Sequence, residues 1–245
     1  AASFSGKPGR VWLTEIGWPT HSGGGQPETR QAEFLVRAYM DALSVKGVEN
    51  VTWYDFIGDG EDENEMEHNF GLLHRDLTPK PAYLAFRTMS EALAGKEYAG
   101  ALQPGGGVTA YLWKGKGETA CLWPGENGFY TFEGGAFLLF NVYGDRLGRT
   151  VYLKAGQPVF AAGERLGGLK VRKEGAFIPP SVVRGGSVKL TAPAALVPKS
   201  LPECCSFSDG FLRAGKGPLV PGRAVFSAGE SDVEIDILPE TLILR

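Results

Sequence analysis

The first 95 residues alternate between a strand-like and a helix-like pattern of apolar positions. An apolar run rich in β-forming residues, 11–17, predicts a buried strand, and residues 50–57 predict a second one. Between them, residues 27–46 place apolar side chains on one face at the helical period. A second helix is expected over residues 81–93, with Gly95 ending it. The order strand, helix, strand, helix predicts parallel β/α units.

Beyond Gly95 the helical period stops and short strand-like runs take its place. The chain holds 35 glycines and 16 prolines, many of them in this part, where they separate the runs. Short strands at regular intervals with such turns are typical of an antiparallel β-sandwich. The expected strands cover residues 108–113, 119–123, 137–143, 150–153 and 158–161.

From residue 164 the strand signals are weaker. Strands are expected over residues 169–172, 187–192, 223–228 and 232–238, and the last of these alternates polar and apolar positions as a half-buried strand does. Residues 193–202 are expected to form a linker or long loop. Three aromatic residues are expected in a core rather than in a sugar-stacking patch: Phe207, Phe211 and Phe226.

The predicted fold class is therefore α/β followed by all-β. We expect an α/β part over residues 1–95, a β-sandwich over 96–163, and a second β-rich unit over 164–245.

Composition and charge bear on the kinds of partner that the chain binds. The 28 acidic and 25 basic residues give a formal net charge of -3 without a basic stripe, so nothing indicates a nucleic-acid partner. No apolar run approaches the roughly 18 residues of a membrane span, and no membrane partner is expected.

Cysteine and histidine positions give no sign of a disulfide framework or a metal site. The cysteines are Cys121, Cys204 and Cys205, an odd number in which two are adjacent, and adjacent cysteines rarely pair. Neither these cysteines nor the three histidines have the spacing of a metal motif. We therefore expect no metal and no cofactor.

Glu15 is the residue with the strongest chemical signal. It stands near the end of the first predicted strand, and after Ile16 a Gly-Trp-Pro turn follows. Carboxylates are rarely buried without a partner. Groups at the ends of barrel strands are often catalytic. The alternative is an edge-strand glutamate that simply reaches water.

Four segments together resemble the end of a retaining glycoside hydrolase. They are residues 14–20 (TEIGWPT), 53–56 (WYDF), 67–73 (EHNFGLL) and 78–83 (TPKPAY). The resemblance is to the large clan of (β/α)8-barrel enzymes with β-xylosidase-like and cellulase-like members, and it covers about the first 95 residues. It implies that Glu15 ends the seventh strand as the nucleophile. It also implies that Trp53 on the eighth strand stacks on a sugar, and an ordinary barrel-core aromatic is the alternative. Further candidate contacts of the substrate are Trp18, Glu67, His68 and Asn69, of which the last three are alternatively residues that support such contacts from behind.

The resemblance implies an incomplete TIM barrel as well. A barrel needs eight strands and about 250 residues, and only two strands are predicted here. The acid/base glutamate of the clan, usually preceded by asparagine, lies on the fourth strand, and only fourteen residues precede Glu15. The chain is therefore expected to hold the last two β/α units and the trailing β-sandwich modules. It would need the upstream remainder of the barrel for activity, and alone it is expected to be inactive. A secreted or cell-surface parent protein fits this picture.

Residues 59–67 hold six carboxylates and predict a solvated acidic loop. The alternatives are a calcium site, although the spacing is not that of an EF-hand, and the missing acid/base carboxylate. Two other functions stay open for the chain. One is a non-catalytic carbohydrate-binding or scaffold module, in which the sandwiches bind sugar through a row of exposed aromatics. The other is a structural interaction module on a cell surface.

Overall fold

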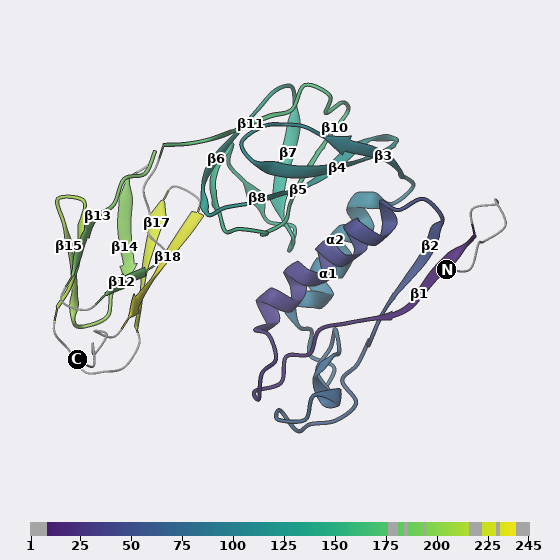
Figure 1. The fold of residues 1–245 in the computed structure, drawn as a ribbon, viewed down its shortest axis with the longest axis horizontal. Coiled ribbons are helices and arrows are strands. Elements are labelled where there is room, and N and C mark those ends of the chain that lie inside the picture. The colour runs from purple at the N-terminus through teal and green to yellow at the C-terminus, as the bar shows by residue number, and fades with distance from the viewer. Residues whose placement is uncertain are drawn as a thin grey trace, which may run out of the picture.

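The computed structural model of the chain describes residues 9–175, 181–183, 186–193, 195–215, 222–228 and 231–238. An α/β part is followed by central antiparallel sheets and then by a C-terminal β unit, which lies at the far end of the molecule from the α/β part (Figure 1). The expected class, α/β followed by all-β, is confirmed at this level. The described residues form no closed barrel.

The α/β part has the predicted order of strand, helix, strand and helix. β1 and β2 pair in parallel as a two-stranded sheet. Gly95 directly follows the C-cap of α2 in the left-handed region, with φ of 66°, as a helix-ending glycine does. α1 ends earlier than predicted, at Leu43, so Gly47, with φ of 98°, lies beyond its C-cap Ser44. The second strand ends at Trp53, four residues earlier than predicted. The elements are β1 (Val11–Ile16), α1 (Glu28–Leu43), β2 (Val48–Trp53), the 3-10 helix η1 (Glu67–Asn69) and α2 (Pro81–Leu93).

The expectation that the first strand is buried is wrong. Leu13 and Ile16 pack against the core that the helices share, but Val11 is 44% and Trp12 65% exposed. The physical reason is that α1 and α2 cover one face of the β1–β2 sheet, while no described element covers the other. The helix prediction is confirmed, since α1 buries the expected face through Ala32, Leu35, Val36 and Tyr39.

The central part consists of two antiparallel sheets. One has the strand order β3-β4-β5-β10-β7-β8, and the other has the order β11-β6-β9. The expected strands are all present, whereas β3, β6 and β8 were not predicted. The bounds are β3 (Glu97–Leu102), β4 (Val108–Gly115), β5 (Gly117–Pro124), β6 (Gly128–Glu133), β7 (Phe137–Asn141), β8 (Arg146–Leu147), β9 (Thr150–Leu153), β10 (Val159–Gly163) and β11 (Lys170–Lys173).

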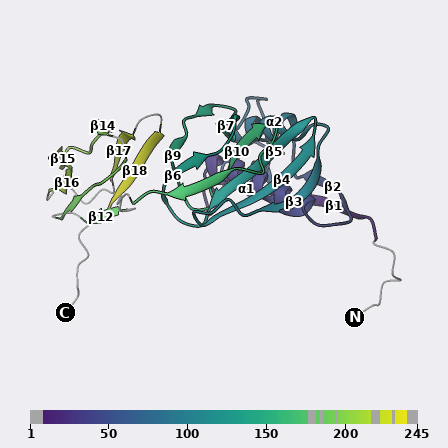
Figure 2. The ribbon, with the colours of Figure 1, turned by 90° about the horizontal axis from the view of Figure 1, so that it is seen from above.

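β11 lies beyond the expected boundary at residue 163, yet it pairs with β6 along four residues. The central sheets therefore extend to residue 173, and the division into domains stays a prediction. Trp113, Trp123 and Phe160 of the six-stranded sheet belong to the same core as the buried residues of α1 and α2. This sheet lies over the two helices (Figure 2). One continuous core thus joins the α/β part to the central sheets.

The C-terminal unit contains two further sheets, ordered β12-β18-β17-β14 and β13-β16-β15. The period-two alternation of β18 is confirmed: Val233, Ile235 and Ile237 are fully buried between polar neighbours. The bounds are β12 (Ser181–Val183), β13 (Ser187–Lys189), β14 (Leu196–Ser200), β15 (Cys205–Ser208), β16 (Phe211–Ala214), β17 (Gly222–Ala228) and β18 (Ser231–Leu238).

The linker expected over residues 193–202 is wrong where it covers β14, which pairs with β17. Pro198 lies within this strand, which is tolerated because β14 is at the edge of its sheet. The core assignment of two aromatics is confirmed. Phe226 is fully buried and Phe207 meets it edge-on at 4.8 Å, whereas Phe211 is half-buried.

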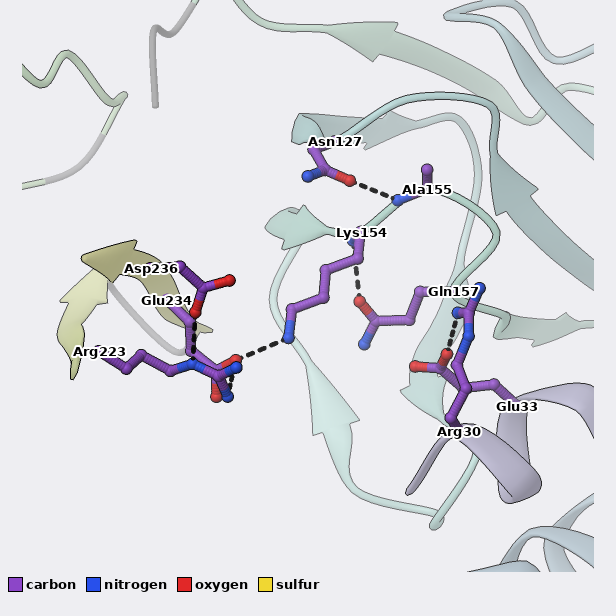
Figure 3. A network of polar contacts seen from close by, with 9 residues as sticks. All are labelled: Arg30, Glu33, Asn127, Lys154, Ala155, Gln157, Arg223, Glu234 and Asp236. Carbon is purple, nitrogen blue, oxygen red and sulfur yellow. Dashed lines mark hydrogen bonds and ion pairs between the residues drawn. The ribbon is translucent and has the colours of Figure 1, made fainter. Parts of the chain in front are cut away.

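The central sheets and the C-terminal unit are joined by apolar and charged contacts. Phe129 and Tyr152 of the central sheets belong to the same apolar cluster as the buried residues of the C-terminal unit. At the edge of this junction Lys154 extends toward Glu234 of β18 and pairs with it at 2.8 Å (Figure 3). Arg223 pairs with the same carboxylate at 3.2 Å. No helix among the described residues combines the length and apolarity needed to cross a membrane.

Candidate active site at the ends of β1 and β2

Glu15 lies at the carboxyl end of β1, beside the carboxyl end of the parallel strand β2. Its side chain is exposed and opens into a pocket of about 400 Å³. The rest of the pocket is formed by Ile16, Gly17, Tyr54, Glu67 and Phe70. Two of the predicted site residues, Glu15 and Glu67, therefore share one pocket, although they are far apart in the sequence.

Gly17 holds the two strand ends close together. The backbone N–H of Tyr54 donates to the carbonyl of Ile16 at 2.9 Å. A Cβ on residue 17 would lie 2.1 Å from the carbonyl oxygen of Tyr54 and 3.0 Å from the ring of Phe70. Only glycine permits this approach, so the sequence Glu-Ile-Gly fixes where the Glu15 side chain stands relative to Tyr54.

Tyr54 presents a phenol beside the two glutamates of the pocket. Its hydroxyl is 3.1 Å from Oδ2 of Asp59 and 3.4 Å from Oε2 of Glu67, so it donates toward these carboxylates. The hydrogen bond and the charge of Asp59 raise the pKa of Tyr54 to about 12. The phenol therefore stays protonated at neutral pH. The ring meets Phe70 edge-on at 5.4 Å, and the Tyr54–Asp55 peptide bond is cis.

Trp53 and Trp18 lie outside this pocket. Trp53 is only 7% exposed, and its indole N–H donates to the carbonyl of Phe70 at 3.2 Å. Its ring packs 5.9 Å from that of Trp18, which in turn packs 5.3 Å from Phe34. The reason is strand alternation: Val51 and Trp53 of β2 both point to the helix side. Tyr54, the first residue after the strand, lines the pocket instead. The ring face that was expected to stack on a sugar is covered by the core.

His68 and Asn69 hold the acidic loop instead of lining the pocket of Glu15. The amide of Asn69 donates to the carbonyls of Asp62 and Glu65 at 2.9 and 2.7 Å. Nδ1 of His68 accepts the N–H of Asp62 at 3.2 Å. The carboxylates of the loop, residues 59–67, are exposed as predicted. Of the three residues in the Glu-His-Asn motif, only Glu67 reaches the pocket.

Sequence reasoning missed two charged residues near the pocket: Lys80, which is buried, and Asp55, which is half-buried. Lys80 is 2% exposed and donates to Oγ1 of Thr20 at 3.0 Å and to the carbonyl of Asn69 at 3.1 Å, so it ties together the loops that follow β1 and η1. Burial lowers the pKa of Lys80. The only signal for it was its place in the Thr-Pro-Lys-Pro segment, which names no partner.

Asp55 is the second missed residue. Its Oδ1 is buried and makes no hydrogen bond within the part of the chain that the structure describes. Burial, and then the charge of Asp59, raise the pKa of Asp55 to about 6. A carboxyl that titrates near neutral pH therefore stands directly beside Tyr54. Within the same described residues, no group of three or more His, Cys, Asp or Glu side chains is placed to hold a metal ion.

Comparison with known proteins gives a structural likeness. No protein-family model matches the chain, and no curated protein matches it. A solved structure of a family 39 glycoside hydrolase from the gut symbiont Bacteroides cellulosilyticus WH2 matches with a TM-score of 0.53 and 25% sequence identity. The match covers 62% of this chain and 33% of that enzyme, so the chain spans about a third of its length. The likeness to a glycoside hydrolase is thus found in structure as well as in sequence motifs.

Proposed function

We propose that this chain carries the nucleophile of a retaining glycoside hydrolase that acts on a polysaccharide or oligosaccharide. The observation that carries the proposal is the place of Glu15, at the carboxyl end of a strand in a parallel β/α arrangement, inside a pocket that it shares with Tyr54 and Glu67. Catalytic groups of (β/α)8 barrels lie at this end of the strands. The structural likeness to a family 39 glycoside hydrolase supports the same interpretation.

In this proposal β1 and β2 are the last two strands of a barrel. The helices cover one face of the pair, and Trp12 is exposed on the other. In a barrel that second face points inward and is filled by side chains from the other strands. The remainder of the barrel is therefore the partner that would cover Trp12, and it would supply the acid/base residue that faces Glu15.

The chemistry assigns separate roles to the residues of the pocket. A retaining hydrolase needs two carboxyl groups about 5–5.5 Å apart. One attacks the anomeric carbon and forms a glycosyl-enzyme, while the other protonates the leaving oxygen and later activates water. Glu15 takes the nucleophile's role. Tyr54, which Asp59 keeps in place, takes the sugar-contacting role first expected for Trp53, and Glu67 accepts hydrogen bonds from sugar hydroxyls.

A non-catalytic sugar-binding role for the sandwiches receives no support from their surfaces. Such a role needs a row of exposed aromatics on one sheet face. Among the described residues, the strongly exposed apolar aromatics are Trp12 and Phe56, and both belong to the α/β part. In the described part of the C-terminal unit, Phe226 and Phe207 pack into the core and Phe211 is half-buried.

The test is covalent trapping of the nucleophile. The protein is expressed from the complete reading frame that encodes this chain and treated with a panel of 2-deoxy-2-fluoro glycosyl fluorides. Fluoride leaves without acid assistance and the C2 fluorine slows hydrolysis, so the glycosyl-enzyme accumulates. Peptide mapping should place the added sugar on Glu15. Glu15→Gln, which keeps the size and removes the nucleophilic charge, should remain unlabelled, and labelling of another carboxylate would overturn the assignment.

Azide rescue provides an independent readout. Glu15→Gly in the same protein should lose hydrolysis of activated aryl glycosides and recover part of it with azide, because a small anion fills the space of the missing carboxylate. Glu67→Gly is the matched variant from the same pocket. Since Glu67 is assigned to binding, azide should not rescue it, and rescue of Glu67→Gly alone would exchange the two roles.

A further inference from the structure

Two thiols lie side by side in the turn that leads into β15. Cys204 and Cys205 are both half-buried, and their Sγ atoms are 3.8 Å apart. The backbone around them is held on both sides. The N–H of Cys205 donates to the carbonyl of Pro202 at 2.8 Å, and the carbonyl of Cys204 accepts the N–H of Gly215 at 2.7 Å. The two sulfur atoms therefore face each other on a fixed turn.

We propose that Cys204 and Cys205 form a reversible exchange site for low-molecular-weight disulfides such as oxidised glutathione. This site lies in the C-terminal unit and is independent of the glycosidase assignment. In the first step one cysteine thiolate attacks a sulfur of the small disulfide, which forms a mixed disulfide and releases one thiol. In the second step the neighbouring thiolate attacks the protein sulfur of the mixed disulfide and releases the other thiol. The two protein thiols lose two protons and two electrons, which leave on the two released thiols.

The geometry favours the second step over persistence of the mixed disulfide. A disulfide bond is about 2.05 Å long, so the sulfur atoms must approach by roughly 1.8 Å, which side-chain rotation provides. The neighbouring thiol is already 3.8 Å from its target. Holding a nucleophile so close to the reacting atom makes the step effectively unimolecular and fast.

The same geometry makes the product reversible. Adjacent Cα atoms are about 3.8 Å apart, whereas the Cα atoms of ordinary disulfides are usually about 4.4–6.8 Å apart. A bond between Cys204 and Cys205 closes an eight-membered ring and is strained by this mismatch. Strained and accessible disulfides are the more easily reduced ones. The pair is therefore suited to exchange rather than to permanent bridging.

Cys121 provides an internal control within the same chain. Its side chain is fully buried in the core between the helices and the central sheet. Burial raises the pKa of the Cys121 thiol. The reactive species is the thiolate, and access is also needed, so this cysteine should be inert in the folded protein.

The experiment treats the folded chain with oxidised glutathione, quenches it with iodoacetamide and maps peptides by mass spectrometry. The tryptic peptide of residues 200–213 should lose the mass of two hydrogen atoms, and dithiothreitol should restore it. Cys121 should react at least about 100-fold more slowly. Cys204→Ser and Cys205→Ser should each stop at the glutathione adduct, with circular dichroism showing that both variants are folded.

Three results would overturn the proposal. One is a wild-type peptide that remains glutathionylated without closing to the internal bond. Another is equal reactivity of all three cysteines, which would mean that the local turn gives no advantage. The third is an internal bond that forms only after urea unfolding. Cys121→Ser should behave as the wild type in every measurement.

Discussion

Trp12 offers the sharpest test of whether β1 and β2 belong to a larger barrel. The indole is 65% exposed on the sheet face opposite the helices. If the rest of a barrel covers that face, Trp12 becomes a core residue, and if nothing covers it, Trp12 is a surface residue. The substitution Trp12→Thr separates the two cases because threonine, like tryptophan, favours the strand conformation, while it removes the aromatic area.

The expected difference in unfolding free energy follows from the exposed area. A tryptophan side chain buries roughly 200 Å², so the 65% that is now exposed amounts to about 130 Å². At ~25 cal/mol per Å² the barrel would add about 3 kcal/mol to the cost of Trp12→Thr. The fraction already buried in the chain alone corresponds to at most about 2 kcal/mol, since area sums from an extended reference are upper bounds.

The assay is urea unfolding followed by circular dichroism, on the chain alone and on the protein from its complete reading frame. Hydrogen exchange of peptides covering β1 provides a local readout. Leu138→Thr is the matched control, because Leu138 is 49% exposed on β7 of the central sheet and should cost the same in both proteins. An equal cost of Trp12→Thr in both would refute the barrel interpretation. So would a complete reading frame that adds no barrel strands.

Four further outcomes are expected. The chain alone should not hydrolyse aryl glycosides measurably above its Glu15→Gln variant, because loss of general acid catalysis alone removes a factor of roughly 10²–10⁴; robust turnover would show that the chain holds a second catalytic carboxyl. Gly17→Ala should destabilise the chain by about 1–3 kcal/mol in urea unfolding, because its Cβ would meet the Tyr54 carbonyl. The control Gly135→Ala, with open space around it, should change the unfolding free energy by no more than about 0.5 kcal/mol, and similar costs for the two variants would contradict the close approach at Gly17. The native pKa of Asp55, about 6, lies above its unfolded value of about 4, so its contribution to stability is present below about pH 4 and is lost as pH rises through about 6. Asp55→Asn should therefore raise the melting temperature at pH 7 more than at pH 4. Asp76→Asn should lower the melting temperature at pH 7, because hydrogen bonds from Thr78 lower the pKa of Asp76. Equal changes of the melting temperature in the same direction for both variants would contradict the opposite pKa shifts of the two carboxyls. Glu234→Gln should cost about 0.5–1 kcal/mol at low salt and nothing measurable near ~1 M NaCl, since its pairs with Lys154 and Arg223 are partly exposed; a cost that persists in salt would indicate a packing role.

Local patterns were enough to predict the elements whose burial is one-sided. α1 has a helical apolar stripe and β18 has a strict two-residue alternation, and each buries the face that its pattern indicates. Glu15 at a strand end was predictable for the same reason, because the apolar run before it and the Gly-Trp-Pro turn after it mark where the strand stops. These predictions need only the neighbours of each residue in the sequence.

Pairing partners were not predictable in this way. β14 falls in the segment that was expected to be a linker or long loop, and its Pro198 is acceptable in a strand only because β14 lies at the edge of a sheet, beside β17. β1 was taken for a buried strand because its residues are apolar, but burial of both faces requires elements that its own sequence does not specify. The roles of His68 and Asn69 likewise depend on Asp62 and Glu65 folding back onto them.

The proposed exchange of roles between Trp53 and Tyr54 rests on which of two neighbouring residues faces the pocket of Glu15. Both residues are aromatic, and Tyr54 directly follows Trp53, the last residue of β2, so the sequence alone does not state which one faces the strand end of Glu15. The helix side of the sheet is fixed by Val51, which is buried against α1 and α2, and alternation then assigns Trp53 to the same side. Gly17 completes the assignment, because its lack of a side chain lets the Tyr54 backbone approach and brings the phenol beside Glu15 and Glu67. Trp53 therefore faces the core and Tyr54 faces the pocket of Glu15, which is why Tyr54 is the residue proposed to contact a substrate.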